Sequence, residues 1–269
     1  MKKIQVYLLF AFVLISGVLY SQKIDSTYMV CYYKMTFQKD STNPNSKYEE
    51  LTVLKIGKES SIFRSYVKEK SDSIIADQVK KVFEKGSSGG IATYDAGAVP
   101  QYDFKPEVYR NGNKITVFER VGMDRFAFES QENIKWKLLN EERKISNFIC
   151  KKAIGKYRNR TIIAWYTNEM NIPEGPYNFK NLPGLIIELQ DDKDTIHFTL
   201  AGLKKMKLPI EQKMNGIYLT TYEKFKRNRE EFAKDPISKL ANTRMFKFLT
   251  HEDRENLSKS LKSENNHLD

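Results

Sequence analysis

The sequence predicts a mainly β fold, a curved antiparallel sheet or half-barrel with one inserted helix and a helical C-terminus. Residues 27–37 (TYMVCYYKMTF) are rich in aromatic and β-branched residues that alternate between two faces. Asn111-Gly112-Asn113 separates two further runs of this kind, and Asn-Gly favours a hairpin turn because it accepts positive φ. Helical spacing of apolar residues appears only once before residue 220.

The first helix is expected near residues 71–85. Ile75, Val79, Val82 and Phe83 follow one another at the spacing that places side chains on one helical face. Strands are expected, in chain order, at 27–37, 48–57, 60–68, 107–110, 114–120, 125–130, 135–139, 148–157, 161–167, 185–189 and 195–203.

The C-terminal part changes from strand to helix patterns. Thr220 with Glu223 predicts a capping box, Asp235 before Pro236 predicts an N-cap, and Thr250 precedes a third helix. The expected organisation is therefore a leader over residues 1–21, a β domain over 22–219, C-terminal helices over 220–262 and a polar tail over 263–269.

The N-terminus resembles a secretory signal peptide. Lysines at positions 2 and 3 precede an apolar run over residues 4–19, and the small residue Ser21 follows. A membrane helix is the alternative, since the run approaches the ~20 residues that cross a bilayer. Cleavage would leave no transmembrane segment. A lysine- and asparagine-rich chain with this leader indicates the periplasm or outer membrane of a Gram-negative bacterium.

Composition limits the classes of partner. With 40% hydrophobic residues and a net charge of +11, the chain is expected to form a packed core with a moderately basic surface. That balance favours acidic proteins or anionic membranes, and it is too small to indicate nucleic acid.

The two cysteines, Cys31 and Cys150, permit a disulfide in an oxidising compartment. The bond would close a long loop and stabilise the chain by ~4–5 kcal/mol in the chain-entropy model. Two buried thiols that pack as small apolar side chains are the alternative.

A proline-rich segment, residues 172–184, is expected to form a rigid elbow. Pro173 and Pro176 have no N–H to donate to a neighbouring strand. Leu182-Pro183-Gly184-Leu185 fits a type II turn with positive φ at the glycine. The apolar run that begins at Leu185 predicts a strand buried on both faces.

The same segment carries a family resemblance. Residues 181–186 (NLPGLI), preceded by AWYTNEMNIPEGPYNF, resemble the signature of the GLPGLI family over roughly residues 147–189. Asn181 stands where the family has glycine, and asparagine tolerates the left-handed conformation best among other residues. The resemblance implies a secreted envelope protein of mostly β structure. It implies no established activity, so no catalytic residues follow from it.

Catalytic and metal-binding patterns are weak. Gly86, Ser88 and Gly90 satisfy the spacing of a hydrolase nucleophile, but a helix precedes the serine where a strand is required. A flexible linker is the alternative. The three histidines share no ligand spacing, so neither a metal nor a cofactor is expected.

Two groups of residues are candidates for ligand or partner binding. Arg158 and Arg160 lie at an expected hairpin tip, in a basic stretch that could contact lipid head groups or an acidic protein. Trp165, Tyr166, Tyr177 and Phe179 could line an apolar concave surface, or could simply form core. The sequence thus predicts a non-enzymatic protein that binds an apolar ligand or an outer-membrane protein or lipid. The alternatives are a serine hydrolase and a purely structural envelope protein.

Overall fold

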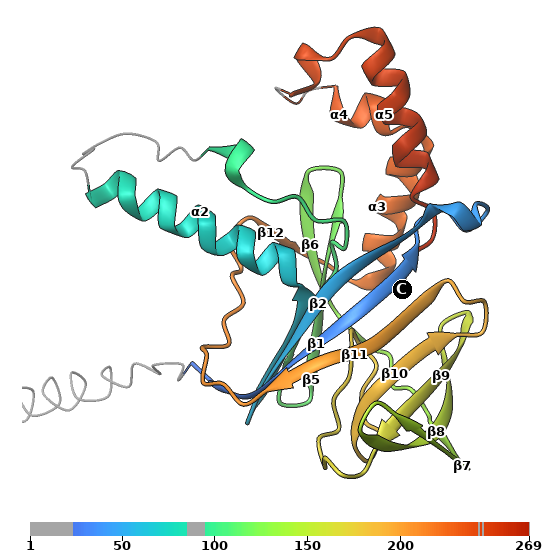
Figure 1. Cartoon of the computed structure of the whole chain (residues 1–269). Helices are drawn as coiled ribbons and strands as arrows, with labels where there is room; N and C mark the ends of the chain where they lie inside the picture. Colours follow the sequence, from blue (N-terminus) through green and yellow to red (C-terminus); the bar gives the residue numbers. More distant parts are fainter. Residues whose placement is uncertain (1–23, 85–94, 242, 244, 269) are drawn as a thin grey trace, which may run out of the picture.

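The computed structural model describes residues 24–84, 95–241, 243 and 245–268 (Figure 1). The expected leader over 1–21 and the Gly86–Gly90 loop lie outside the described residues. The described chain confirms a mainly β fold: a single curved sheet of 12 strands that does not close on itself, with β12 and β7 as its two edges.

The order of strands across the sheet is β12-β6-β5-β4-β3-β2-β1-β11-β10-β9-β8-β7. Two meanders, β2–β6 and β7–β11, meet through β1, and only β12 runs parallel to its neighbour β6. The strands are β1 Thr27–Gln38, β2 Lys47–Gly57, β3 Ser60–Ser65, β4 Glu107–Asn111, β5 Lys114–Val121, β6 Asp124–Glu129, β7 Lys137–Ile145, β8 Phe148–Tyr157, β9 Arg160–Thr167, β10 Leu185–Asp191, β11 Ile196–Lys204 and β12 Ile217–Leu219.

Helices occupy two places along the described chain, as the sequence predicts. They are α2 Tyr66–Glu84, α3 Tyr222–Lys234, α4 Pro236–Leu240 and α5 His251–Ser263, with short 3₁₀ turns η1 Pro44–Ser46, η2 Ala96–Ala98 and η3 Met245–Phe248. The strand expected to reach residue 68 ends instead at Ser65, whose Oγ accepts a hydrogen bond from Lys68 N at 3.1 Å. That bond begins α2 five residues earlier than the apolar spacing indicates.

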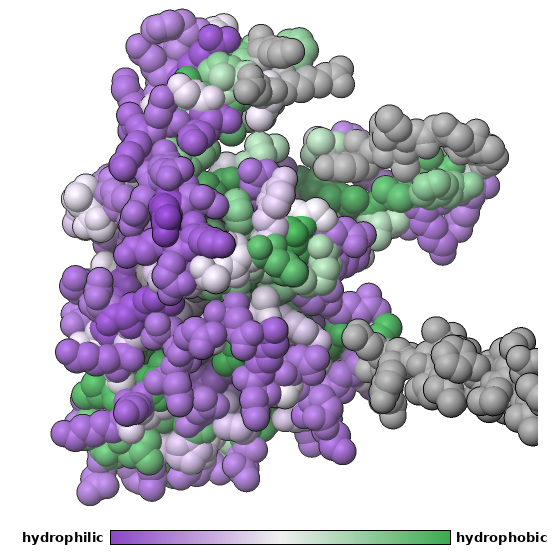
Figure 2. Space-filling model, turned by 180° about the vertical axis from the view of Figure 1, so that it is seen from behind, coloured by the Kyte–Doolittle hydropathy of each residue, from purple (hydrophilic) through white to green (hydrophobic). Residues whose placement is uncertain are grey.

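The distal half of α2 projects from the sheet (Figure 1). Ile75, Val79 and Val82 are half-buried there, and Phe83 is 62% exposed. This stripe appears as a hydrophobic face on the projecting helix in Figure 2, while most of the surface in that view is hydrophilic.

The C-terminal caps follow the sequence closely. Asp235 caps α4 and Thr250 forms a capping box with Asp253 at α5, as predicted. The cap of α3 is Thr221 rather than Thr220, because the Thr221 hydroxyl accepts from Lys224 N and strand-like backbone continues to that point.

The predicted disulfide is wrong. Cys31 and Cys150 are both buried free thiols. Cys31 lies in β1 and Cys150 in β8, and strands β11, β10 and β9 separate them in the sheet. Four strand spacings amount to about 19 Å along the sheet, whereas a disulfide needs Cα atoms within about 7 Å. Burial raises the pKa of Cys31 to about 12, which keeps this thiol protonated.

The elbow, residues 172–184, contacts both meanders of the sheet. Tyr177 and Phe179 have no exposed surface, and their rings lie 6.3 and 5.1 Å from the ring of Tyr157 in β8. On the other meander the Lys180 ammonium reaches Ser61 Oγ in β3 at 3.3 Å. The elbow is therefore a wedge that both halves of the sheet hold.

The elbow's backbone follows turns that its prolines favour. Glu174 N donates to Ile172 O at 2.7 Å and Gly184 N donates to Leu182 O at 2.7 Å, which are three-residue γ-turns centred on Pro173 and Pro183. The predicted type II turn is wrong, since Gly184 has no positive φ. The Asn181 prediction is confirmed, because its φ is 68°.

Glycine at 184 is required for space. A Cβ there would lie 2.0 Å from Thr167 O, at the point where the elbow enters β10. As predicted, Leu185, Ile186 and Leu189 are buried on both faces of that strand, which lies between β11 and β9.

A buried charged triad closes the elbow. The Lys180 ammonium is paired with the Glu174 carboxylate, and the two residues are 3% and 4% exposed. Arg110 Nε in β4 donates to the same carboxylate at 2.7 Å. Burial raises the pKa of Glu174, but Lys180 and Arg110 lower it further, so the net shift is downward and the carboxylate is ionised.

Gly184→Ala is expected to destabilise the protein by roughly 2–3 kcal/mol, since the new methyl group must displace the Thr167 carbonyl. Gly202→Ala in β11 is the matched control, because its Cβ would meet nothing within 4 Å. Denaturant unfolding of both variants measures the difference. Equal midpoints would contradict the close approach at Gly184.

Glu174→Gln is expected to lower the free energy of unfolding by about 3–5 kcal/mol at neutral pH, because it leaves the Lys180 ammonium buried without its carboxylate. Lys180 and Arg110 hold the folded-state pKa of Glu174 below its ordinary value in spite of burial, so its stabilising contribution is present above the ordinary pKa and is lost as the pH falls through the folded value. The free energy of unfolding of Glu174→Gln should therefore lack the part of the acid dependence that comes from the Glu174 carboxylate.

The matched control is Glu142→Gln, which alters a 3.7 Å surface pair with Lys151 and should change stability by less than about 1 kcal/mol. Unfolding curves from neutral to acidic pH measure both variants. A wild-type-like profile for Glu174→Gln would contradict the triad's role.

Candidate functional site

The structure places three of the four aromatic candidates in the core. Tyr166, Tyr177 and Phe179 are at most 2% exposed, so their side chains support packing and leave no open apolar surface there. Trp165 points to the opposite face of β9, half-buried, with the Arg143 guanidinium 4.3 Å from its ring centroid.

The two arginine candidates lie together in a groove of about 570 Å³ at one end of the sheet, which we call the tail groove. Its walls are the β8–β9 turn, the β10–β11 turn, helix α3 and the segment after α5. The lining residues are Ser41, Glu132, Arg158, Asn159, Arg160, Lys193, Thr195, Tyr222, Lys226, Arg229, Asn265, Asn266 and His267.

Arg160 joins the walls of the tail groove. Its guanidinium donates to Asp191 Oδ2 at 2.7 Å and to Thr195 Oγ1 at 2.8 Å, both at the β10–β11 turn. The same side chain donates to His267 O at 2.9 Å and also to the Asn266 side chain. Arg160 therefore holds two walls of the groove in place, the β10–β11 turn and the segment after α5.

The described part of the polar segment after α5 docks on the rest of the fold. Asn266 N donates to Lys39 O at 3.0 Å, and its side chain donates to Gln38 O at 2.6 Å. Leu268 is 3% exposed and packs into the core. A short polar segment has no sequence periodicity that would reveal this docking.

Arg158 lies two residues before Arg160, in the β8–β9 turn that forms the same wall. It occupies the hairpin turn with φ 54°, and its guanidinium lies 3.6 Å from the Tyr222 ring centroid of α3. Arg158 also pairs with Glu132 at 3.3 Å. Its Nε is buried and donates to no acceptor among the described residues.

Charge in the tail groove is strongly one-sided. Five cationic side chains line it, from Arg158, Arg160, Lys193, Lys226 and Arg229, and Glu132 is the one carboxylate among the lining residues. Lys193 is exposed and has no carboxylate within 4 Å among the described residues, and Lys226 lies 3.9 Å from Glu230. This arrangement suits an anion.

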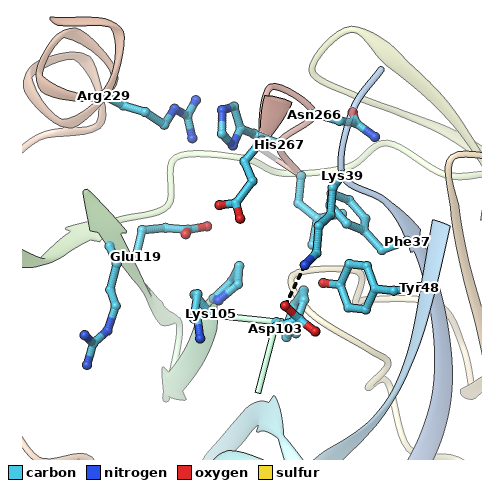
Figure 3. Close-up of a pocket in the computed structure, with 14 residues that line it drawn as sticks. Phe37, Lys39, Tyr48, Asp103, Lys105, Glu119, Arg229, Asn266 and His267 are labelled. Atoms are coloured by element: carbon cyan, nitrogen blue, oxygen red, sulfur yellow. Dashed lines mark hydrogen bonds and ion pairs between the residues drawn. The ribbon is translucent and has the colours of Figure 1, made fainter. Parts of the chain in front are cut away.

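A second cavity of about 130 Å³ shares Arg229, Asn266 and His267 with the tail groove (Figure 3). Four cationic side chains and three carboxylates line this cavity, and Lys39 pairs with Asp103 at 2.5 Å. Burial lowers the pKa of Lys105 in this cavity. The tail groove therefore has the larger excess of cationic lining side chains, five against one carboxylate.

Sequence reasoning found Arg158 and Arg160 but missed the partners that complete the groove. Lys226 and Arg229 belong to a stretch, EKFKRNREEF, that has the ordinary pattern of a charged helix surface. Lys193 lies in a turn of the β10–β11 hairpin. Only the topology brings these residues together.

Two kinds of feature were not found among the described residues, a cluster of metal ligands and a membrane-spanning helix. No group of three or more His, Cys, Asp or Glu side chains could hold a metal ion within residues 24–84, 95–241 and 245–268. Within the same residues, no helix is long and apolar enough to span a membrane.

Comparison with known proteins gives a local match. Residues 156–188 match the model of a family described as a protein of unknown function (Porph_ging). That segment contains the two groove arginines and the whole elbow. No curated protein matches the chain.

Two solved structures of PNGF-II, in space groups P21 and C2, are similar to this chain at 16% and 14% sequence identity, each with a TM-score of 0.47. Each comparison covers 77% of this chain and 33% of the solved chain. This chain therefore spans about a third of the length of the structures it matches.

Arg160→Ala is expected to release the segment 264–268, because the substitution removes the hydrogen bonds that tie Asn266 and His267 to β9. Hydrogen exchange should rise at least tenfold in that segment, which corresponds to about 1.4 kcal/mol. Lys156→Ala, an exposed residue on the same hairpin, is the control. Unchanged exchange at 264–268 would show that Arg160 does not hold it.

Proposed function

We propose that this chain is an exported, non-enzymatic protein of the Gram-negative cell envelope that binds an anionic partner in the tail groove. Export and envelope location are supported by the leader-like N-terminus and by the resemblance of the elbow to the GLPGLI signature. The match of residues 156–188 to a family of unknown function is compatible with this and names no activity.

One observation supports anion binding above the rest: five cationic side chains surround the groove against one lining carboxylate, Glu132. Arg158 and Arg160 are held rigidly by Tyr222 and Asp191, so little side-chain entropy is lost when a ligand binds there. Lys193 and Lys226 are exposed at the rim, where they would attract an anion from solution.

An apolar ligand is less well supported. Of the four aromatic side chains that could have lined a concave apolar surface, Tyr166, Tyr177 and Phe179 are buried in the core. Trp165 is half-buried, with the Arg143 guanidinium over its ring. If the groove binds no anion, the alternative is that the protein has a purely structural role in the envelope.

The Lys193→Glu/Lys226→Glu variant is expected to bind a general polyanionic probe, the trisulfonated dye pyranine, at least tenfold more weakly than the wild type. Reversing two rim charges replaces attraction by repulsion, and tenfold corresponds to about 1.4 kcal/mol. Fluorescence anisotropy at low salt measures the affinity, which should fall further as salt screens the charges.

The control is Lys205→Glu/Lys207→Glu, which makes the same charge change in exposed residues beyond the far end of β11. Nine strand residues separate the two ends, about 30 Å. The control should bind within twofold of wild type. Equal losses in both variants, or no dye binding at all, would refute the proposed site.

A further inference from the structure

The hydrogen-bonding capacity of the tail groove indicates what kind of anion it takes. Its neutral polar side chains are largely occupied by one another. Ser41 Oγ donates to Asn265 Oδ1 at 2.7 Å, and Asn265 Nδ2 donates to Asp40 at 2.9 Å. Thr195 Oγ1 donates to Asp191 at 2.7 Å. A ligand would thus be recognised chiefly through the cationic groups.

The net positive charge of the side chains around the tail groove is larger than one carboxylate of a ligand can neutralise. The five cations of the groove face three carboxylates: Glu132, the buried Asp191 behind Arg160, and Glu230, which lies 3.9 Å from Lys226. The cationic side chains therefore outnumber the carboxylates by two. A phosphate monoester brings about −1.5 to −2 at neutral pH with three acceptor oxygens, and a diphosphate brings more.

The donors left for a ligand match phosphoryl oxygens. The ammonium groups of Lys193 and Lys226 at the rim act as point charges, which suit phosphate. The Nε of Arg158 is buried and has no acceptor among the described residues. Glu132 is the one lining carboxylate, and it already pairs with Arg158, so acceptors for ligand hydroxyl groups are scarce.

We propose that the tail groove binds a phosphate-bearing ligand, with Lys193 and Lys226 contacting the phosphoryl oxygens and Arg158 and Arg160 as the fixed wall behind them. This inference rests on the proposed function and narrows it to one chemistry. Soluble phosphorylated molecules and lipid head groups share that chemistry, and the groove's volume of about 570 Å³ admits either.

Calorimetric titration with inorganic pyrophosphate tests the proposal directly. Citrate is the matched anion, because it has a similar charge near neutral pH but carries it on carboxylates. We expect pyrophosphate to bind the full chain at least tenfold more tightly than citrate. The Lys193→Gln/Lys226→Gln variant should lose tenfold or more, while Lys205→Gln/Lys207→Gln should stay within twofold of wild type.

The two proposals fail in different ways. Equal affinity for citrate and pyrophosphate, with pyranine still bound, would overturn the phosphate inference and leave anion binding intact. No binding of pyrophosphate, citrate or pyranine would overturn both.

Vesicles separate the two sources of phosphate. Flotation with vesicles of phosphatidylcholine containing phosphatidic acid, which has a phosphomonoester head group, would show binding that pyrophosphate competes away if the ligand is a lipid. Pyrophosphate binding without flotation would support a soluble ligand. Flotation that pyrophosphate does not compete would overturn the assignment to the groove.

Discussion

The buried Glu174–Lys180 pair, joined by Arg110, is the interaction on which the rest of the structure depends. Its charges lie inside a sheet that curls around the elbow, where breaking one partner costs about 3–5 kcal/mol. Because Arg110 belongs to β4 and the other two residues to the elbow, the triad also joins one meander of the sheet to the wedge. Without the elbow, Tyr157 of β8 would lose the two ring contacts that pack against it.

The elbow sets the position of the candidate site as well. Its aromatic side chains pack against Tyr157, the last residue of β8, and Arg158 follows directly in the hairpin turn. Two rings in the core thus fix the backbone from which the groove's first cation projects. Arg160 then ties the next strand to the β10–β11 turn and to the segment after α5. Packing in the core therefore fixes the positions of the cationic side chains that line the tail groove.

The sequence predicted the strands and helices well where the signal was local. Alternation predicted β1, the Asn111–Asn113 turn predicted the β4–β5 hairpin, and Asp235 and Thr250 predicted helix starts. It failed where contacts are distant. The local sequence does not show that three strands separate Cys31 from Cys150 in the sheet. It also does not show that residue 184 must be glycine because its backbone lies close to Thr167, and not because it needs a positive φ. The groove was half predicted, because Arg158 and Arg160 share a hairpin while Lys193 and Lys226 reach it only through the fold.

Hydrogen exchange measured with and without pyrophosphate tests the central claim most directly, because it locates the ligand on the chain. The account predicts added protection at residues 158–160, 193–195 and 264–267, with the already buried elbow unchanged. Protection confined to α2 or to the β7 edge, or none at saturating ligand, would contradict it.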